Sequence, residues 1–233
     1  MKPASSPIER RTLRLAAALA LLAGCATSPP PAPVDVRQTL APTGTLRIAV
    51  YPGSPTSMVE DAPDAERRGL TVDIGRELAR SLGVPAAIQV YPRVAEVVAA
   101  LSRGEADVTI TNATAERQKL LDFAPPLVAL ELGVLVPAGS PVSSVDTIDR
   151  AGARIGVSPG SSSERALGPR LRQRELDAFA TNKAVLFELA ISVPGARVLD
   201  GRWGPEHLAL GTGKAREAAL PWLRGSAPVE AAP

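Results

Sequence analysis

In the first half of the chain, short apolar runs typical of strands alternate with apolar residues at the three- and four-residue spacing of helices. Short, mostly apolar runs over 46–50 and 87–90 are typical of β-strands, and a third strand is expected over 107–111. Apolar residues over 94–101 recur at i, i+3, i+4 and i+7, which predicts an amphipathic helix that ends at Gly104. This part of the chain is therefore predicted to alternate strands with helices.

The same alternation restarts after an apolar extended run over 130–136. Two successive blocks of this kind predict two lobes, each with a largely parallel sheet and with a cleft between them. Ligands bind outside the carboxyl ends of such strands, so the loops after Val50, Thr111, Val157 and Ala180 are the expected walls of a site. The second block is expected to contain strands over 154–157, 177–180 and 197–199 and helices from Ser162 and over 183–191.

The first 24 residues have the pattern of an export signal. Basic residues from Lys2 to Arg14 precede an apolar run over 15–23, which is shorter than the about 20 residues that span a bilayer. The run ends in Leu22-Ala-Gly-Cys25, which resembles the site where a lipoprotein signal is cut before a lipid-modified cysteine. Cys25 is the only cysteine, so an internal disulfide is excluded and lipidation is predicted.

Loss of this leader changes the charge of the chain. It removes four of the 26 basic residues and one of the 24 acidic ones, which leaves 22 against 23 and a balance of −1. With 3% aromatic residues and no basic run, the chain has no platform for stacking bases, so nucleic acid is not an expected partner. The proline-rich stretch that follows, within 25–43, is expected to be an extended tether.

Several motifs resemble family 3 of the extracellular solute-binding proteins, the polar-amino-acid type of ABC transporters. Each motif is modestly specific, but they occur in the family's order. The matching segments are Gly69-Leu-Thr-Val-Asp-Ile-Gly-Arg-Glu-Leu78, Leu101-Ser-Arg-Gly-Glu-Ala-Asp107, Thr114-Ala-Glu-Arg117, Asp122-Phe-Ala-Pro125, Ile155-Gly-Val-Ser-Pro-Gly-Ser-Ser-Ser-Glu164 and Leu176-Asp-Ala-Phe179.

The resemblance implies an α/β fold with the two-lobe architecture of periplasmic binding proteins (type II, Venus-flytrap). It implies a monomer on the periplasmic or other extracytoplasmic face, anchored through Cys25, which delivers a carboxylate or amino-acid ligand to an ABC permease. The expected organisation is a signal over 1–24, a tether over 25–43, lobe one over 44–136 with 205–224 returning to it, lobe two over 137–204 and a tail over 225–233.

The residues of the expected site follow Thr114 and the lobe-two turn. Arg117 lies in the first helical turn, where a guanidinium and backbone N–H groups suit a carboxylate, and the resemblance gives it the ligand's α-carboxylate. Ser161 and Glu164 have the spacing of a capping box that opens a helix toward the cleft. The remaining candidate ligand-binding residues are Thr114, Asn112, Ser162, Asn182, Tyr51 and Tyr91.

Two positions depart from the family pattern. Asn182, followed by Lys183, stands where the family carries an aspartate for the ligand's ammonium, which disfavours a standard zwitterionic amino acid and favours another anionic solute. Between Arg172 and Leu176 a strand and a helix are absent, so lobe two is expected to be truncated and to expose apolar surface.

Two other functions stay open at this point. The shortened lobe is compatible with a sensor or with a lipoprotein that has lost its ligand. A cyclic-acid dehydratase on the same fold would need an acid or base in the cleft, for which only Glu164 and His207 are candidates. With one histidine and a lipidated cysteine, neither a metal nor another cofactor is expected, and binding without catalysis is the main prediction.

Overall fold

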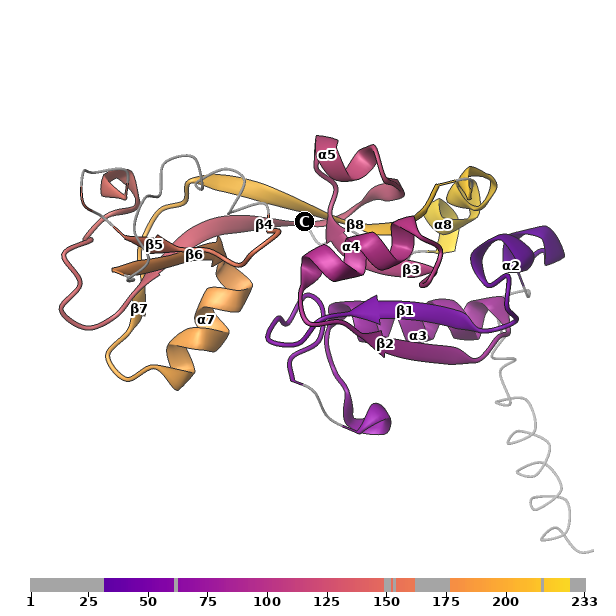
Figure 1. Cartoon of the computed structure of the whole chain (residues 1–233), viewed down its shortest axis with the longest axis horizontal. Helices are drawn as coiled ribbons and strands as arrows, with labels where there is room; N and C mark the ends of the chain where they lie inside the picture. Colours follow the sequence, from indigo (N-terminus) through magenta and orange to yellow (C-terminus); the bar gives the residue numbers. More distant parts are fainter. Residues whose placement is uncertain are drawn as a thin grey trace, which may run out of the picture. The chain divides into compact units, whose positions relative to one another are not determined.

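The computed structural model describes residues 32–60, 63–148, 152, 154–161, 177–214 and 216–226 (Figure 1). The expected leader, Cys25, Ser162 and Glu164 lie outside these residues, as does the interval from Arg172 to Leu176. Within the described ranges, no helix combines the length and the apolar character that a membrane span requires.

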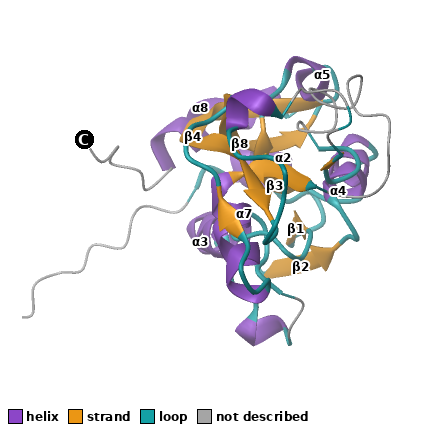
Figure 2. Ribbon diagram, turned by 90° about the vertical axis from the view of Figure 1, so that its left-hand side faces the viewer, coloured by secondary structure: helices purple, strands orange, loops and turns teal. Residues whose placement is uncertain are grey.

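Lobe one contains a parallel sheet with helices on both faces. The central strand β1 pairs in parallel with β2 and β3. Helices α3 and α4 lie on opposite sides of β1 (Figure 2). Ile48 of β1 belongs to the core cluster that includes α3, whereas its neighbour Ala49 belongs to the cluster that includes α4, because successive side chains of a strand point to opposite faces. The elements are β1 (Leu46–Val50), η2 (Asp64–Glu66), α3 (Leu70–Leu82), β2 (Ala86–Val90), α4 (Val94–Ser102), β3 (Val108–Asn112) and α5 (Ala115–Gln118).

Two long antiparallel strands, β4 (Leu121–Val136) and β8 (Gly204–Gly213), cross between the lobes (Figure 1). Their pairing runs from Leu121 opposite Gly213 to Leu132 opposite Gly204. The register shifts on both sides of Pro126, which is consistent with a residue that has no backbone N–H to donate to the ladder. β8 also pairs antiparallel with β3, so the crossing strands join the sheets of both lobes.

Lobe two adds a smaller sheet to the other side of β4. The strand order through the described residues is β2-β1-β3-β8-β4-β6-β5, with β7 paired to β4. β2 extends the lobe-one sheet beyond β1, whereas β5 ends the sheet of lobe two in this part of the chain, as the predicted truncation requires. The elements are η3 (Val145–Thr147), β5 (Ile155–Gly156), β6 (Ala178–Asn182), α7 (Lys183–Ser192) and β7 (Arg197–Val198).

Each lobe has its own hydrophobic core. The lobe-two core is small and includes Val134, Ile155 and Leu199. On its helix α7, Leu186 is fully buried, while Phe187 is 58% and Ile191 83% exposed. Apolar side chains are therefore exposed on helix α7 of lobe two.

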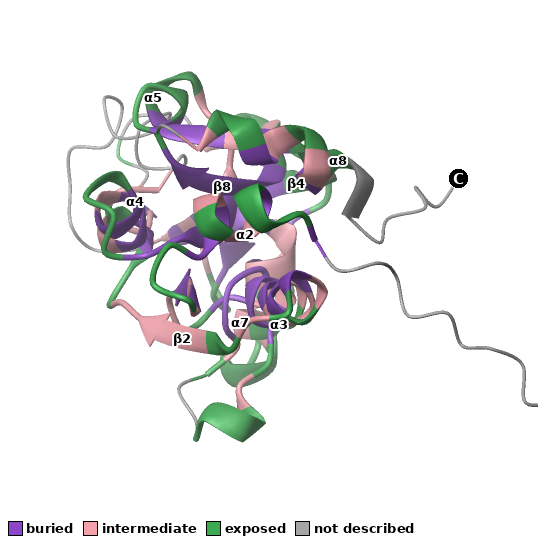
Figure 3. Ribbon diagram, turned by 90° about the vertical axis from the view of Figure 1, so that its right-hand side faces the viewer, coloured by how far each residue is buried: buried purple, intermediate pink, exposed green. Residues whose placement is uncertain are grey.

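The segment over 34–40 differs from the extended tether expected up to residue 43. It forms a helix, α2 (Val34–Leu40), beside η5 (Glu217–Ala219) and α8 (Leu220–Ser226), as Figure 3 shows. Val36 and Leu40, four residues apart on one face, are buried in the lobe-one core, whereas Val34 is exposed. The expected tether boundary is corrected accordingly, because the apolar residues of this helix belong to the folded lobe.

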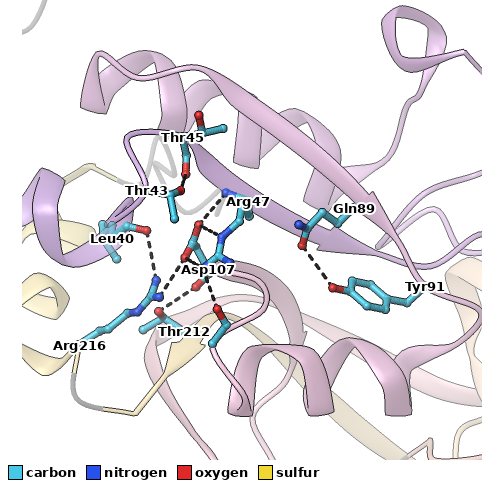
Figure 4. A network of polar contacts seen from close by, with 10 residues as sticks. Leu40, Thr43, Thr45, Arg47, Gln89, Tyr91, Asp107, Thr212 and Arg216 are labelled. Carbon is cyan, nitrogen blue, oxygen red and sulfur yellow. Dashed lines mark hydrogen bonds and ion pairs between the residues drawn. The ribbon is translucent and has the colours of Figure 1, made fainter.

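An arginine–aspartate pair recurs at the start of the strands in both lobes. In lobe one, Asp107 accepts hydrogen bonds from the backbone N, Nε and Nη2 of Arg47 at 2.8, 2.9 and 2.7 Å (Figure 4). In lobe two, Asp177 accepts from the same three groups of Arg154 at 3.0, 3.1 and 2.8 Å. Asp107 is fully buried and also pairs with Arg216 at 2.9 Å. These pairs fix the register at the start of two parallel strand pairs.

Candidate functional site

A pocket of about 210 Å³ lies between the lobes and is lined from both of them. All four loops expected as its walls contribute: Tyr51 follows β1, Asn112 ends β3, Ser158 follows β5 and Thr181 lies at the end of β6. The crossing strand β8 supplies Glu206. The carboxyl ends of the parallel strands therefore meet at this pocket, as the topology of both lobes requires.

Arg117 lines this pocket with its guanidinium held on several sides. Its side chain is only 4% exposed. Nη1 donates to the Thr111 hydroxyl at 2.6 Å and to the backbone oxygen of Asn112 at 3.2 Å. Nη2 donates to the backbone oxygen of Gly160 at 3.3 Å, which links α5 of lobe one to the turn after β5 of lobe two. The guanidinium is thus oriented by groups of both lobes.

Thr114 lies outside the pocket lining and contacts Arg117, which lines it. Its hydroxyl accepts a hydrogen bond from the backbone N–H of Arg117 at 3.3 Å and caps α5. Thr114 is not among the lining residues, so the structure gives it the position of a support for Arg117.

The two asparagines predicted for the site converge on Glu206. Asn182 donates through Nδ2 to Oε2 of Glu206 at 3.1 Å, and Asn112 donates to Oε1 over a longer 3.4 Å. The side chain of Glu206 is 8% exposed, and that of Asn182 is 5% exposed. A carboxylate on the crossing strand is therefore held by one amide from each lobe.

The two tyrosines occupy different places. Tyr51 lines the pocket, and burial raises the pKa of its hydroxyl; a hydrogen bond to Ser54 lowers this pKa, and the charge of Glu206 raises it. Tyr91 lies outside the lining residues, donates to Gln89 at 3.2 Å and packs against the α4 cluster. The prediction for Tyr91 is corrected, because its ring covers the buried face of α4.

The lobe-two wall contains Ser158, Pro159 and Ser161. Ser161 lines the pocket as predicted, and its backbone N–H donates to the Ser158 oxygen at 3.1 Å. The proposed roles of Ser162 and of Glu164 as its capping partner lie outside the described residues.

Sequence reasoning missed Glu206 and Thr111. Glu206, Leu208 and Leu210 alternate along β8, and the first two line the pocket. An acidic residue in the two-residue period of an apolar strand is the signal that could have identified Glu206.

The charged residues among the described lining of the pocket are two arginines and one glutamate. Its lining includes the guanidinium groups of Arg93 and Arg117 and the carboxylate of Glu206, of which Arg93 pairs with Glu96 at 2.9 Å. No group of three or more metal-binding side chains occurs among the residues that the structure describes.

The two-lobed α/β fold with a pocket between the lobes defines the class of periplasmic binding proteins. Residues 46–216 match family 3 of the bacterial extracellular solute-binding proteins, and the chain belongs to this family. The ArgBP P235GK mutant from T. maritima superimposes with a TM-score of 0.70 at 16% identity, over 82% of this chain and 91% of that one. The ancestral amino-acid-binding protein AncCDT-1, a precursor of cyclohexadienyl dehydratase, gives 0.65 at 21% identity, over 82% and 91%.

A sequence relative links the chain to a longer protein. Over 111 residues, which make up 46% of this chain, the chain is 35% identical to the membrane-bound lytic murein transglycosylase F of Maricaulis maris (strain MCS10). The match spans 24% of that relative, about a quarter of its length.

Proposed function

We propose that the protein captures a small carboxylate-bearing solute in the pocket between its lobes and delivers it to an ABC permease. The observation that carries this proposal is the guanidinium of Arg117, which lines the pocket and is held by both lobes. Anchoring through a lipid on Cys25, outside the cytoplasmic membrane, completes the proposal.

Arg117 has the chemistry that a carboxylate needs. A guanidinium presents five N–H donors in a planar fork, and the bonds to Thr111, Asn112 and Gly160 set the direction of this fork. Burial lowers the local dielectric constant, so a charged partner gains more from the contact than it would in water.

The pocket also supports closure around a solute. Its polar lining comes from Tyr51 and Asn112 in lobe one and from Ser161 and Asn182 in lobe two. A ligand that contacts both lobes favours the conformation in which they meet, because those contacts are lost when the lobes separate.

Thermal unfolding of the full chain with a panel of amino acids, dicarboxylates and small anions tests this function. A ligand at 100 times its Kd stabilises the folded state by about 2.7 kcal/mol, roughly 5–10 °C for a chain of this size. Arg117→Ala is expected to abolish the shift, whereas Arg68→Ala, at an exposed position, keeps it. A cooperative transition that no compound moves would contradict solute capture and favour a sensor or scaffold.

Catalysis on the same fold needs an acid or base in the pocket. Of the two candidates from the sequence, His207 is exposed and is not among the lining residues, and Glu164 lies outside the described part of the chain. Glu206 is a carboxylate that does line the pocket, where it accepts hydrogen bonds from two asparagine amides. We propose binding without turnover, and incubation with prephenate followed by product analysis tests it.

A further inference from the structure

The folded part of lobe one begins close to Cys25, the residue proposed to carry the lipid. Ala32, just before helix α2, is only 4% exposed and already belongs to the lobe-one core. It follows Cys25 by seven residues, which in any conformation reach at most about 25 Å. This reach is shorter than the roughly 30 Å diameter of a small domain. A lipid on Cys25 therefore holds lobe one within its own diameter of the bilayer.

The elements next to this point form a surface at the amino end of the lobe-one sheet. Helices α2 and α8 lie beside each other, and both contact η5 (Figure 1 and Figure 3). α2 precedes the amino end of β1, whereas the pocket lies at the carboxyl ends of the parallel strands. None of the described residues of α2, η5 or α8 lines the pocket. These three elements, which we call the α2–α8 surface, are thus separate from the solute site.

Two side chains of the α2–α8 surface have the character of residues at a membrane interface. Val34 is 65% exposed at the start of α2. Trp222 of α8 packs against the lobe-one core but stays partly exposed. Trp203 donates through Nε1 to the backbone oxygen of Gly133 at 3.2 Å, whereas the indole N–H of Trp222 makes no hydrogen bond within the described residues. A tryptophan with an apolar body and an available N–H suits the boundary between acyl chains and headgroups.

The charges of the α2–α8 surface decide which kind of bilayer contact it can make. Its exposed charges have both signs, since Asp35 and Glu217 are acidic and Arg224 is basic. Electrostatic attraction to anionic lipids is typical of clusters of about four or more basic residues, which these exposed positions do not form. The surface therefore fits a bilayer through apolar and aromatic contact, and not through the charge of the headgroups.

We propose that the α2–α8 surface rests on the bilayer that holds the lipid of Cys25, with Val34 and Trp222 at the boundary between acyl chains and headgroups. The inference rests on the proposed anchoring at Cys25 and is independent of solute capture. Two such contacts are weak by themselves, but the short tether keeps the surface at a high effective concentration near the lipid. Lobe two, at the other end of the crossing strands, stays clear of the bilayer (Figure 1).

Tryptophan fluorescence of the lipid-modified protein in vesicles tests the inference. The protein is purified from membranes, the lipid on Cys25 is verified by mass spectrometry, and the protein is reconstituted into phosphatidylcholine vesicles with brominated acyl chains, which quench tryptophans in contact with the lipid. We expect quenching in the parent protein and its loss in Trp222→Phe, which retains Trp203. Lipidated protein that floats with the vesicles but is not quenched overturns the inference and leaves anchoring intact. A Cys25 without lipid overturns both, and thermal unfolding with solutes measures capture separately.

Charged substitutions at exposed positions then assign the contact to this surface. Val34→Asp places a charge at the proposed boundary and is expected to reduce the quenching of Trp222 severalfold. Ile191→Asp is the matched control on α7 of lobe two, where the side chain is 83% exposed, and is expected to leave the quenching unchanged. Equal quenching in the two variants overturns the assignment.

Two further conditions separate this contact from other partners. Phosphatidylglycerol in the vesicles, or added salt, is expected to change the quenching little, because the α2–α8 surface has no basic cluster. Quenching that requires anionic lipid and is lost in salt overturns the proposed apolar contact. Without vesicles, protection of Trp222 from acrylamide that increases with protein concentration indicates a second copy on this surface and also overturns the inference.

Discussion

Arg117 of lobe one donates through Nη2 to the backbone oxygen of Gly160 in lobe two over 3.3 Å. Gly160 has a positive φ of 75°, and a Cβ built on it would lie 2.5 Å from the Cβ of Ala95 on α4. The turn after β5 thus rests directly on lobe one, and glycine permits both the backbone conformation and the close approach. This contact connects the solute-binding arginine to the arrangement of the lobes.

Gly160→Ala is expected to weaken solute binding about tenfold by separating this turn from α4. The Cβ of Ala95 is bonded directly to the backbone of α4 and cannot move aside as the end of a long side chain could, so the lobes must shift. Gly139→Ala is the matched control, because its φ is 76° but nothing lies within 4 Å of the added methyl group. Titration calorimetry on both variants checks this; equal affinities would show that the contact does not matter.

Asp107→Asn is expected to destabilise the fold by about 3 kcal/mol, because it leaves two arginines beside an uncharged buried amide. Asp177→Asn is expected to cost less. Its side chain is 13% exposed and that of Arg154 is 29% exposed, against 0% for Asp107, so water screens the lobe-two pair better. Urea unfolding of both variants makes the comparison, and an equal loss of stability would contradict this ranking.

Leu40→Ala is expected to destabilise the fold by about 2–5 kcal/mol, because it removes a fully buried side chain from the lobe-one core. Val34→Ala lies in the same helix at 65% exposure and serves as the control with little expected change. Both are measured by urea unfolding of the full chain. If Leu40→Ala unfolds like the control, α2 does not contribute to the lobe.

The two tyrosines are expected to ionise above the usual pH of about 10 in the folded protein. Burial raises the pKa of both Tyr51 and Tyr91. When the pKa of a phenol is higher in the folded state than in the unfolded state, its contribution to stability is fully present at pH values below the unfolded-state pKa. This contribution is lost as the pH rises through the folded-state pKa. Absorbance at the tyrosinate band follows the titration, with Tyr51→Phe to identify the pocket residue; a normal midpoint for Tyr51 would contradict its burial.

The sequence pattern predicted those elements whose side chains repeat with a clear period. The strand over 46–50 and the helix from Val94 were expected where they lie, since the strand is mostly apolar and the helix has a one-sided apolar pattern. The helix over 34–40 was missed because prolines precede it and only Val36 and Leu40 mark its buried face. The proline-rich composition predicted an extended segment, and the spacing of only two apolar residues was too short to indicate a helix.

The motifs of the sequence indicated some of the residues that line the pocket, but not those that the pairing of distant segments brings there. Arg117, Asn112 and Asn182 line the pocket together, as expected from segments that resemble the family. Glu206 joins them only because β8 pairs with both β3 and β4, a relationship between segments nearly a hundred residues apart. Local periodicity carries no information on such pairing.

The shortened lobe shows how a binding protein can change in size without rebuilding its centre. In the described chain β5 stands at the outer end of the strand order, and the pocket is lined from β3, β6 and β8 in the interior of that order as well as by the turn after β5. Material removed beyond an outer strand leaves the inner ones paired on both sides. The margin of a lobe can therefore differ in extent while the inner strands that carry Asn112, Asn182 and Glu206 stay paired.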